Sequence, residues 1–359
     1  MKYLTHWLTA TITLSLLVFL RVQDGGLTET LRLKSFDYLQ STDPITVSED
    51  IIIVELDEKS IEMNGQWPWS RDKIADLIWQ LREQGAGIIL LPILFSEDDR
   101  AGQDMALAQA LVGNGVVIGQ VGTTQTNKNA VPRGVAKIGD PLPWLFQWPG
   151  MLGPIELLGL NADGVGVLNI APEIDGVTRR VPLIMTVGEQ TYPAMAIEMI
   201  RVAVGDPSYQ IKAGAGGVIA VRVPGYDTIY TDQHARIWLR WNKQFPTVSS
   251  ADDLSVVAGK TVIVGLTAEG LASTIASPTG TQYAHTPIAV SLQTIINGEN
   301  IQRTDLADMY ELAYLLIVGL LLIIASRFVH YIIVAGTILV LGVGTVFGAV
   351  YLYSNYLML

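Results

Sequence analysis

Two runs of mainly apolar residues, Ile51 to Leu56 and Gly87 to Phe95, flank the stretch around which the chain is organised. Between them, the segment from Arg71 to Glu83 has the spacing of a helix with one buried face, carried by Ile74, Ala75, Leu77, Ile78 and Leu81. Ser70 is placed to cap this helix and Gly85 to end it. Strands without polar alternation are covered on both faces, so the pattern predicts a strand–helix–strand unit of a parallel sheet.

The same alternation of apolar runs and helical segments continues along the chain. It predicts strands at 116–121, 164–170, 179–187, 218–223, 235–241 and 261–265, and helices at 27–40, 103–111, 192–204 and 287–297. The Asp175-Gly176 pair predicts a turn that joins 164–170 and 179–187 into a hairpin. The five prolines between Gln125 and Leu160 predict a long irregular segment. Strands that alternate with helices in this order favour a doubly wound core.

Three apolar stretches, Leu4–Leu20, Tyr310–Ser326 and Tyr331–Met358, are candidates for membrane spans of roughly 20 residues. Half of the chain is hydrophobic and only 16% is charged, which also favours a membrane protein. The expected fold class is therefore an α/β extracytoplasmic domain with a mainly parallel sheet flanked by helices, plus three transmembrane helices. The predicted boundaries are 1–22 for an N-terminal anchor, 23–305 for the outer domain, and 306–328 and 329–357 for two further spans.

The first apolar stretch has two interpretations, a secretory signal peptide and an uncleaved anchor. The residues after it, beginning at Arg21, lack a small-x-small cleavage site, which favours the anchor. Lys2 and Arg327 place the N-terminus and the last turn in the cytoplasm, so the segment from Val22 to Asp308 is expected outside. Three spans would then leave the C-terminus outside, at the far face of the membrane or cut before a fourth span.

Charge and composition argue against several functions for this chain. A net charge of −11 and a pI near 4.8 argue against nucleic-acid binding. The absence of cysteine removes disulfides and thiolate catalysis. The four histidines are far apart in the sequence, and no HExxH or Gly-x-Ser-x-Gly motif is present. We therefore expect no catalysis, no metal and no cofactor, and we interpret Glu97-Asp98-Asp99 as a solvated loop, with a cation site as the alternative.

Three ordered blocks carry a family resemblance. They are IIIVELDEKSI…GQWPWSRDKIADLIWQL…GAGIILLPILFSEDD, GVGVLNIAPEIDGVTRRVPLI and FPTVSSADDLSVVAGKTVIVGLTAEGL. Together, over roughly Phe36 to Ile301, the chain resembles the second type of CHASE domain, an extracellular sensor associated with cyclases and histidine kinases. The chain departs from the family pattern at Pro92, where an Asp is common, and from His285 to Ser291, where a Gly and a His are usual.

The resemblance implies a multi-pass protein of the bacterial inner membrane, with its main domain in the periplasm. The function expected is a sensory input module that perceives a small solute or a partner and signals through its transmembrane helices. The alternative is a non-catalytic subunit that uses the same fold for docking in a larger membrane assembly, an interpretation favoured by the missing effector segment and the departures at Pro92 and Pro287.

Candidate ligand-binding residues lie in two places. Asp57 ends the first core strand, and either contacts a ligand or Arg71, or caps the turn that follows. Trp67 and Trp69 form either the wall of a pocket or part of the core. Further along, Arg179 and Arg180 follow the Asp175-Gly176 turn. They either clamp an anion or pair with Asp175 or another carboxylate of the same domain.

The last apolar stretch contains Gly344 and Gly348, whose spacing permits close packing of membrane helices. We expect the lipid bilayer as the first partner of this region. A homodimer, or other membrane proteins bound through the spans, is the second expectation, and the identity of a small-molecule ligand is open.

Overall fold

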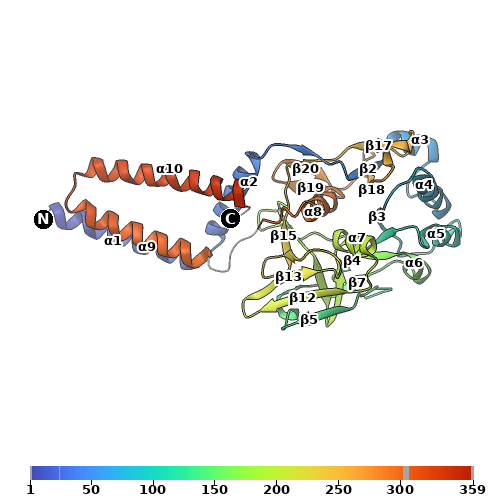
Figure 1. Ribbon diagram of the computed structural model, residues 1–359, viewed down its shortest axis with the longest axis horizontal. Coiled ribbons are helices and arrows are strands. Elements are labelled where there is room, and N and C mark those ends of the chain that lie inside the picture. Colours follow the sequence, from blue (N-terminus) through green and yellow to red (C-terminus); the bar gives the residue numbers. More distant parts are fainter. Residues whose placement is uncertain (1, 24, 126, 302–306, 357–359) are drawn as a thin grey trace. The chain divides into compact units, whose positions relative to one another are not determined.

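The computed structural model describes residues 2–23, 25–125, 127–301 and 307–356, which belong to two compact units. One unit is the α/β domain, Pro44–Asn300, and the other combines Met1–Asp43 with Ile301–Leu359. Figure 1 shows the helices and strands of both units. The predicted boundary at 305/306 and the end of the last predicted span, at 357 and 358, lie outside the described residues.

A central sheet organises the α/β domain. Its strands run in the order β17 (Thr247–Ser249), β2 (Ile51–Leu56), β18 (Thr261–Leu266), β3 (Ile89–Leu94), β4 (Val116–Thr123) and β7 (Gly150–Leu152), and β8 (Gly164–Val167) also pairs with β4. All of these pairs are parallel except that of β4 with β7. Parallel strands require covered faces, in agreement with their apolar sequences.

Helices cover both faces of this sheet. On one side lie α4 (Arg71–Glu83), α5 (Asp104–Leu111) and α6 (Glu156–Asn161), and on the other α7 (Met195–Val204) and α8 (Thr286–Ile296). Alternate residues of a strand enter different cores: Ile89 and Leu91 pack with the first group, whereas Leu90 packs with the second. The central sheet therefore separates the two largest hydrophobic cores of the described part of the domain.

The prediction of a mainly parallel sheet is too simple, because the sheets of the domain are mixed. Two smaller mixed sheets contain β11 (Gln190–Pro193), β10 (Ile184–Val187) and β6 (Phe146–Gln147), and β14 (Ile229–Tyr230), β13 (Gly217–Arg222), β12 (Tyr209–Gly214) and β5 (Val135–Ile138). Three pairs complete the set: β15 (Arg236–Trp238) with β9 (Arg180–Pro182), β19 (Thr274–Ser277) with β20 (Gly280–Tyr283), and β1 (Thr46–Val47) with β16 (Lys243–Gln244). Most of these strands are too short to carry a clear alternation.

The predicted hairpin around Asp175-Gly176 is wrong. The turn itself exists, because Gly176 has a φ of 79° and its N–H donates to the carbonyl of Glu173 at 2.8 Å. However, β8 pairs with β4, while β9 pairs with β15 and β10 with β11. The predicted strand 164–170 therefore joins the central sheet through β8, whereas 179–187 divides into β9 and β10, which join two other sheets. The remaining short helices are α3 (Glu58–Asn64), η1 (Leu142–Trp144) and η2 (Leu254–Val257).

The second unit is helical, with α1 (Lys2–Gln23), α2 (Gly26–Ser41), α9 (Ala307–Ser326) and α10 (Tyr331–Tyr356). Among the described residues, Met309–Ser326 and Ile332–Ser354 are long and apolar enough to cross a membrane. This corrects the prediction of three spans. A third span is counted only if Ala10–Gln23 and Thr28–Ser41, which are bent by 82° relative to each other, form one span.

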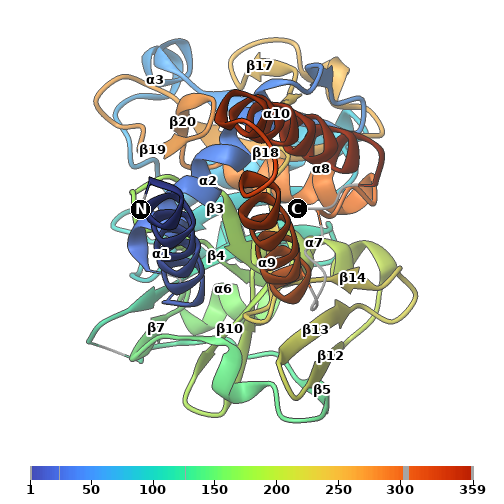
Figure 2. The same cartoon turned by 90° about the vertical axis from the view of Figure 1, so that its left-hand side faces the viewer.

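Helix α1 packs along α9, as Figures 1 and 2 both show. Gly319 of α9 faces Leu14 of α1 so closely that a Cβ at Gly319 would lie 2.5 Å from Leu14 Cδ1. The guanidinium of Arg21 donates to Glu311 Oε2 at 2.8 Å. By contrast, no described residue of another element comes within 4 Å of a Cβ built at Gly344 or Gly348. Packing of these two glycines against a partner span stays a prediction.

Candidate ligand-binding site

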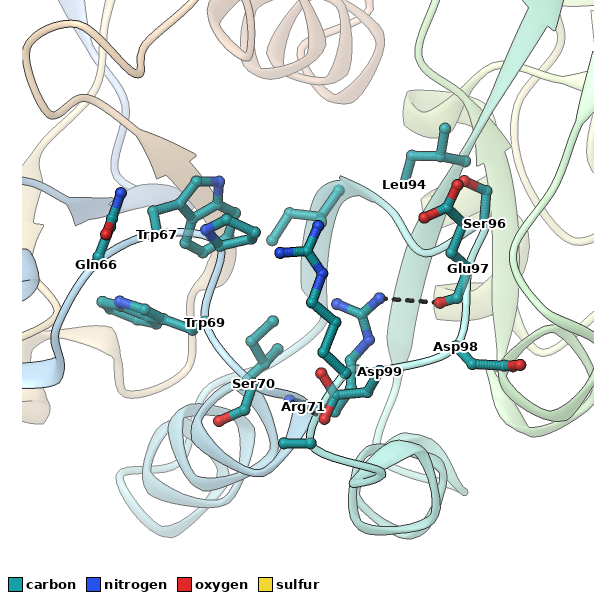
Figure 3. A pocket seen from close by; sticks show the side chains of 15 residues that line it. Gln66, Trp67, Trp69, Ser70, Arg71, Leu94, Ser96, Glu97, Asp98 and Asp99 are labelled. Atoms are coloured by element: carbon teal, nitrogen blue, oxygen red, sulfur yellow. Dashed lines mark hydrogen bonds between the residues drawn. The ribbon is translucent and has the colours of Figure 1, made fainter.

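A cavity of about 550 Å³ lies at the carboxyl end of β3, next to the first turn of α4. We call it the β3 cavity. Its two walls are the segment 66–71, which leads into α4, and the loop 96–101, which follows β3 (Figure 3). Open α/β sheets bind ligands in crevices outside the carboxyl ends of their strands, and the volume is within the range of small-molecule sites.

The first wall is aromatic. The rings of Trp67 and Trp69 meet edge to face, with their centroids 5.7 Å apart. Trp69 is buried, and its indole N–H donates to the carbonyl of Gly65 at 2.8 Å. Trp67 is only half-buried and lines the cavity. Trp69 therefore supports Trp67, which presents an aromatic surface to the cavity.

Arg71, at the first position of α4, ties the two walls together. Its Nη2 donates to the carbonyl of Glu97 at 3.3 Å, and its Nε lies 3.5 Å from Asp104 Oδ1. The guanidinium also stacks over the ring of Phe95, 4.5 Å from the ring centroid. A cation held by a carbonyl, a carboxylate and a ring fixes the start of α4 against the loop after β3.

The acidic loop is braced from within. Asp99 Oδ2 accepts the backbone N–H groups of Gln103, at 3.0 Å, and of Arg71, at 3.4 Å. In turn, the N–H of Asp99 donates to Asp104 Oδ2 at 2.8 Å. These bonds stabilise the loop in one conformation without using the side chains of Glu97 or Asp98.

Pro92 has a structural explanation. The pairing of β3 with β4 shifts register between Leu91 and Leu94, so Pro92 and Ile93 form an irregularity in the strand. Proline has no N–H to give to a sheet, and bulges are among the few places in a strand that accept it. The irregularity precedes the end of β3, where Leu94 lines the cavity.

Asp57 lies outside the lining of the β3 cavity. It caps α3 by accepting the N–H of Ser60 at 2.9 Å, and it accepts the hydroxyls of Ser60 at 2.7 Å and Ser249 at 2.8 Å. Burial by itself would raise the pKa of Asp57, but these hydrogen bonds outweigh it and hold the pKa below its ordinary value. The geometry fits the capping alternative.

The arginines after the Asp175-Gly176 turn also lie away from the cavity lining. The fully buried Arg179 donates through both Nη atoms to Asp175, each at 2.8 Å. Arg180 donates to both oxygens of Glu173, at 2.6 and 2.7 Å, and stacks 4.5 Å above the ring of Trp238. These bidentate pairs correspond to the internal-pairing alternative.

Of the predicted residues, the structure thus brings Trp67, Trp69 and Arg71 together in one cavity. Sequence reasoning missed the opposite wall, because Glu97-Asp98-Asp99 was interpreted only as a solvated loop or a cation site. The position of these three residues could have indicated a site, because they lie in the loop after the carboxyl end of a core strand, as Asp57 does. Within the described ranges, no group of three or more His, Asp or Glu residues is arranged to hold a metal ion.

Comparison with known proteins identifies one family. The family model of the CHASE2 domain matches residues 11–326, which is most of the chain. No curated protein and no solved structure gives a match. The match extends beyond the three blocks that carried the resemblance and confirms it. The chain belongs to the CHASE2 family of extracellular sensor domains.

Proposed function

We propose that this chain is the sensory input module of a membrane-bound signalling system, and that a small solute binds in the β3 cavity. The observation that carries the proposal is the meeting of Trp67, Trp69 and Arg71 in one cavity at the carboxyl end of β3. Sites of this kind combine an apolar wall with a few polar groups that orient the ligand. In this proposal the chain itself performs no catalysis.

The proposed site of action is the bacterial inner membrane, with the α/β domain in the periplasm and the chain crossing the bilayer more than once. Signals pass through α1, which precedes α2 and the domain in sequence, and through α9, which follows the domain; α1 and α9 pack on each other. A ligand shifts such a pair only if it binds one arrangement better than another. A homodimer, or another membrane protein bound through the spans, receives the change.

Spin labels on α1 and α9 test this proposal. The chain has no native cysteine, so Leu16→Cys and Leu320→Cys place labels only at these two exposed positions. The labelled full chain in lipid nanodiscs is exposed to a panel of amino acids, amines, carboxylic acids and sugars. We expect at least one compound to shift the distance distribution between the labels.

The response is expected to disappear in Trp67→Ala and to persist in Trp79→Ala, which removes an exposed tryptophan of α4 outside the cavity lining. A distance distribution that no compound alters would contradict sensing of these solutes. A response that survives Trp67→Ala would place the sensing site elsewhere.

A further inference from the structure

The charged groups of the β3 cavity divide into those already engaged and those available. Arg71 and Asp99 are held by the contacts described above. By contrast, the side chains of Glu97, Asp98 and Arg100 form no hydrogen bond or ion pair with any residue in the described part of the chain. All three are exposed at the cavity. Glu97 and Arg100 are three residues apart, yet they do not neutralise each other.

The two available carboxylates differ in orientation. Glu97 lies across the cavity from Trp67 and Trp69, whereas Asp98 points away from the tryptophans (Figure 3). A carboxylate opposite an aromatic wall suits an ammonium group, which both surfaces attract. Asp98 offers a nearby carboxylate of similar exposure that does not face this wall.

A purely anionic ligand fits less well, because two carboxylates of the protein already lie at the first turn of α4. Asp99 accepts the N–H of Arg71 at 3.4 Å, and the carboxylate of Asp72, in the same turn, accepts the hydroxyl of Ser70. The positive end of the helix dipole is thereby occupied by protein carboxylates. Arg100 is then the available cation for a ligand carboxylate, and a guanidinium can bind one through two hydrogen bonds.

We propose that the β3 cavity selects a small zwitterion, an α-amino acid with an apolar or aromatic side chain. Glu97 accepts hydrogen bonds from its ammonium group, Arg100 donates to its carboxylate, and Trp67 packs against its side chain. This assignment rests on the proposed function, for which it names the class of ligand. It differs from a cation site because both signs of charge in the ligand are required.

Three probes of one shape separate the alternatives: L-phenylalanine, phenethylamine, which lacks the carboxylate, and 3-phenylpropionate, which lacks the amine. Binding to the full chain in nanodiscs is measured by isothermal titration calorimetry, and the other proteinogenic amino acids are tested singly. We expect an apolar or aromatic amino acid to bind at least about tenfold more tightly than either truncated probe, since each lost charged hydrogen bond weakens binding by that order.

Variants assign the charges. Glu97→Gln and Arg100→Gln should each lower the affinity for the amino acid by about tenfold or more. Asp98→Asn, which also removes one negative charge from the loop, should leave this affinity unchanged. If phenethylamine binds as tightly as the amino acid, the cavity is a cation site and the proposal is overturned. Equal binding of 3-phenylpropionate overturns it in favour of an anion site.

Failure of the ligand class and failure of sensing are distinguishable. If no amino acid binds, the zwitterion assignment is wrong, whatever the spin labels report. If a sugar or another solute then shifts the distance between α1 and α9 through Trp67, the sensory function stands with a different ligand. Binding of an amino acid without any change between the labels would instead support the ligand class and contradict signalling through these helices.

Discussion

The imidazole of His285 lies against Gly265 of β18, and a Cβ at Gly265 would be 2.5 Å from His285 Cε1. The ring stacks on Tyr283 with a centroid distance of 5.6 Å and is almost completely buried at the start of α8. Burial lowers the pKa of His285 to about 4. The chain thus fills, with a neutral imidazole, a space that exists because residue 265 has no side chain.

The first prediction concerns this close contact. Gly265→Ala forces the His285 ring or the strand to move, and we expect a loss of about 1–3 kcal/mol in the free energy of unfolding, as for other overpacked cores. Urea denaturation of the full chain measures it. Gly134→Ala is the control, because nothing lies within 4 Å of a Cβ at that exposed glycine. Equal stability of the two variants would show that the His285 ring moves aside without a measurable loss of stability.

A second prediction is a pH dependence. Between pH 6.5 and about 4 the unfolded chain binds a proton at His285 that the folded protein does not, so stability rises with pH across this window and falls on acidification. The full difference amounts to roughly 3 kcal/mol. Denaturation midpoints at about pH 7 and about pH 4.5 measure it, and because carboxylates also titrate near the lower pH, the comparison requires a variant without the imidazole.

His285→Phe is the matched variant, because it keeps a planar ring against Gly265 and removes the titrating group. Its stability should vary less between the two pH values than that of the parent chain. An unchanged slope in His285→Phe would assign the acid sensitivity to other groups.

The third prediction concerns Glu198 of α7, a fully buried carboxylate. It accepts hydrogen bonds from the N–H of Val165 at 3.1 Å, from Arg133 Nε at 3.1 Å, from Arg201 Nη2 at 2.9 Å and from the hydroxyl of Tyr209. Burial, followed by the charge of Glu198, raises the pKa of Tyr209 well above its ordinary value. The carboxylate therefore joins α7 to β8, to β12 and to the loop before β5.

Glu198→Ala leaves these donors without their acceptor, and we expect a loss of about 3–5 kcal/mol, typical of a broken buried ion pair. Glu189→Ala removes an exposed glutamate and should change stability by less than about 0.5 kcal/mol. Thermal or urea unfolding compares the two variants. A small effect of Glu198→Ala would show that water or a local shift replaces the carboxylate.

The fourth prediction tests the ion pair between Arg21 of α1 and Glu311 of α9. Arg21→Glu sets two carboxylates against each other and should broaden the label distances between α1 and α9. Adding Glu311→Arg restores opposite charges and should recover the parent distribution. If the double variant behaves like the single one, the pair does not position these helices.

The sequence predicted some elements well because their signal is local. The apolar face of 71–83 defined α4 to the residue, and the continuous apolar runs located β2, β3 and β18. The short strands β9 and β15 escaped assignment to their sheet because they pair with each other across more than 50 residues. Pairing of neighbouring strands is only the commoner arrangement. The cavity was half predicted, since its aromatic wall is conspicuous, whereas Glu97 and Arg100 resemble ordinary surface charges.

The separation of the domain into two cores also determines how disturbances spread. Side chains that point to α4 and those that point to α8 share only the backbone of the strands between them. A destabilising substitution in one core should therefore leave the packing of the other core unchanged. The losses in unfolding free energy caused by distant substitutions in the two cores should add. A ligand bound beside α4 can affect the packing around α8 only by displacing the strands, so the central sheet itself transmits any change between the two faces.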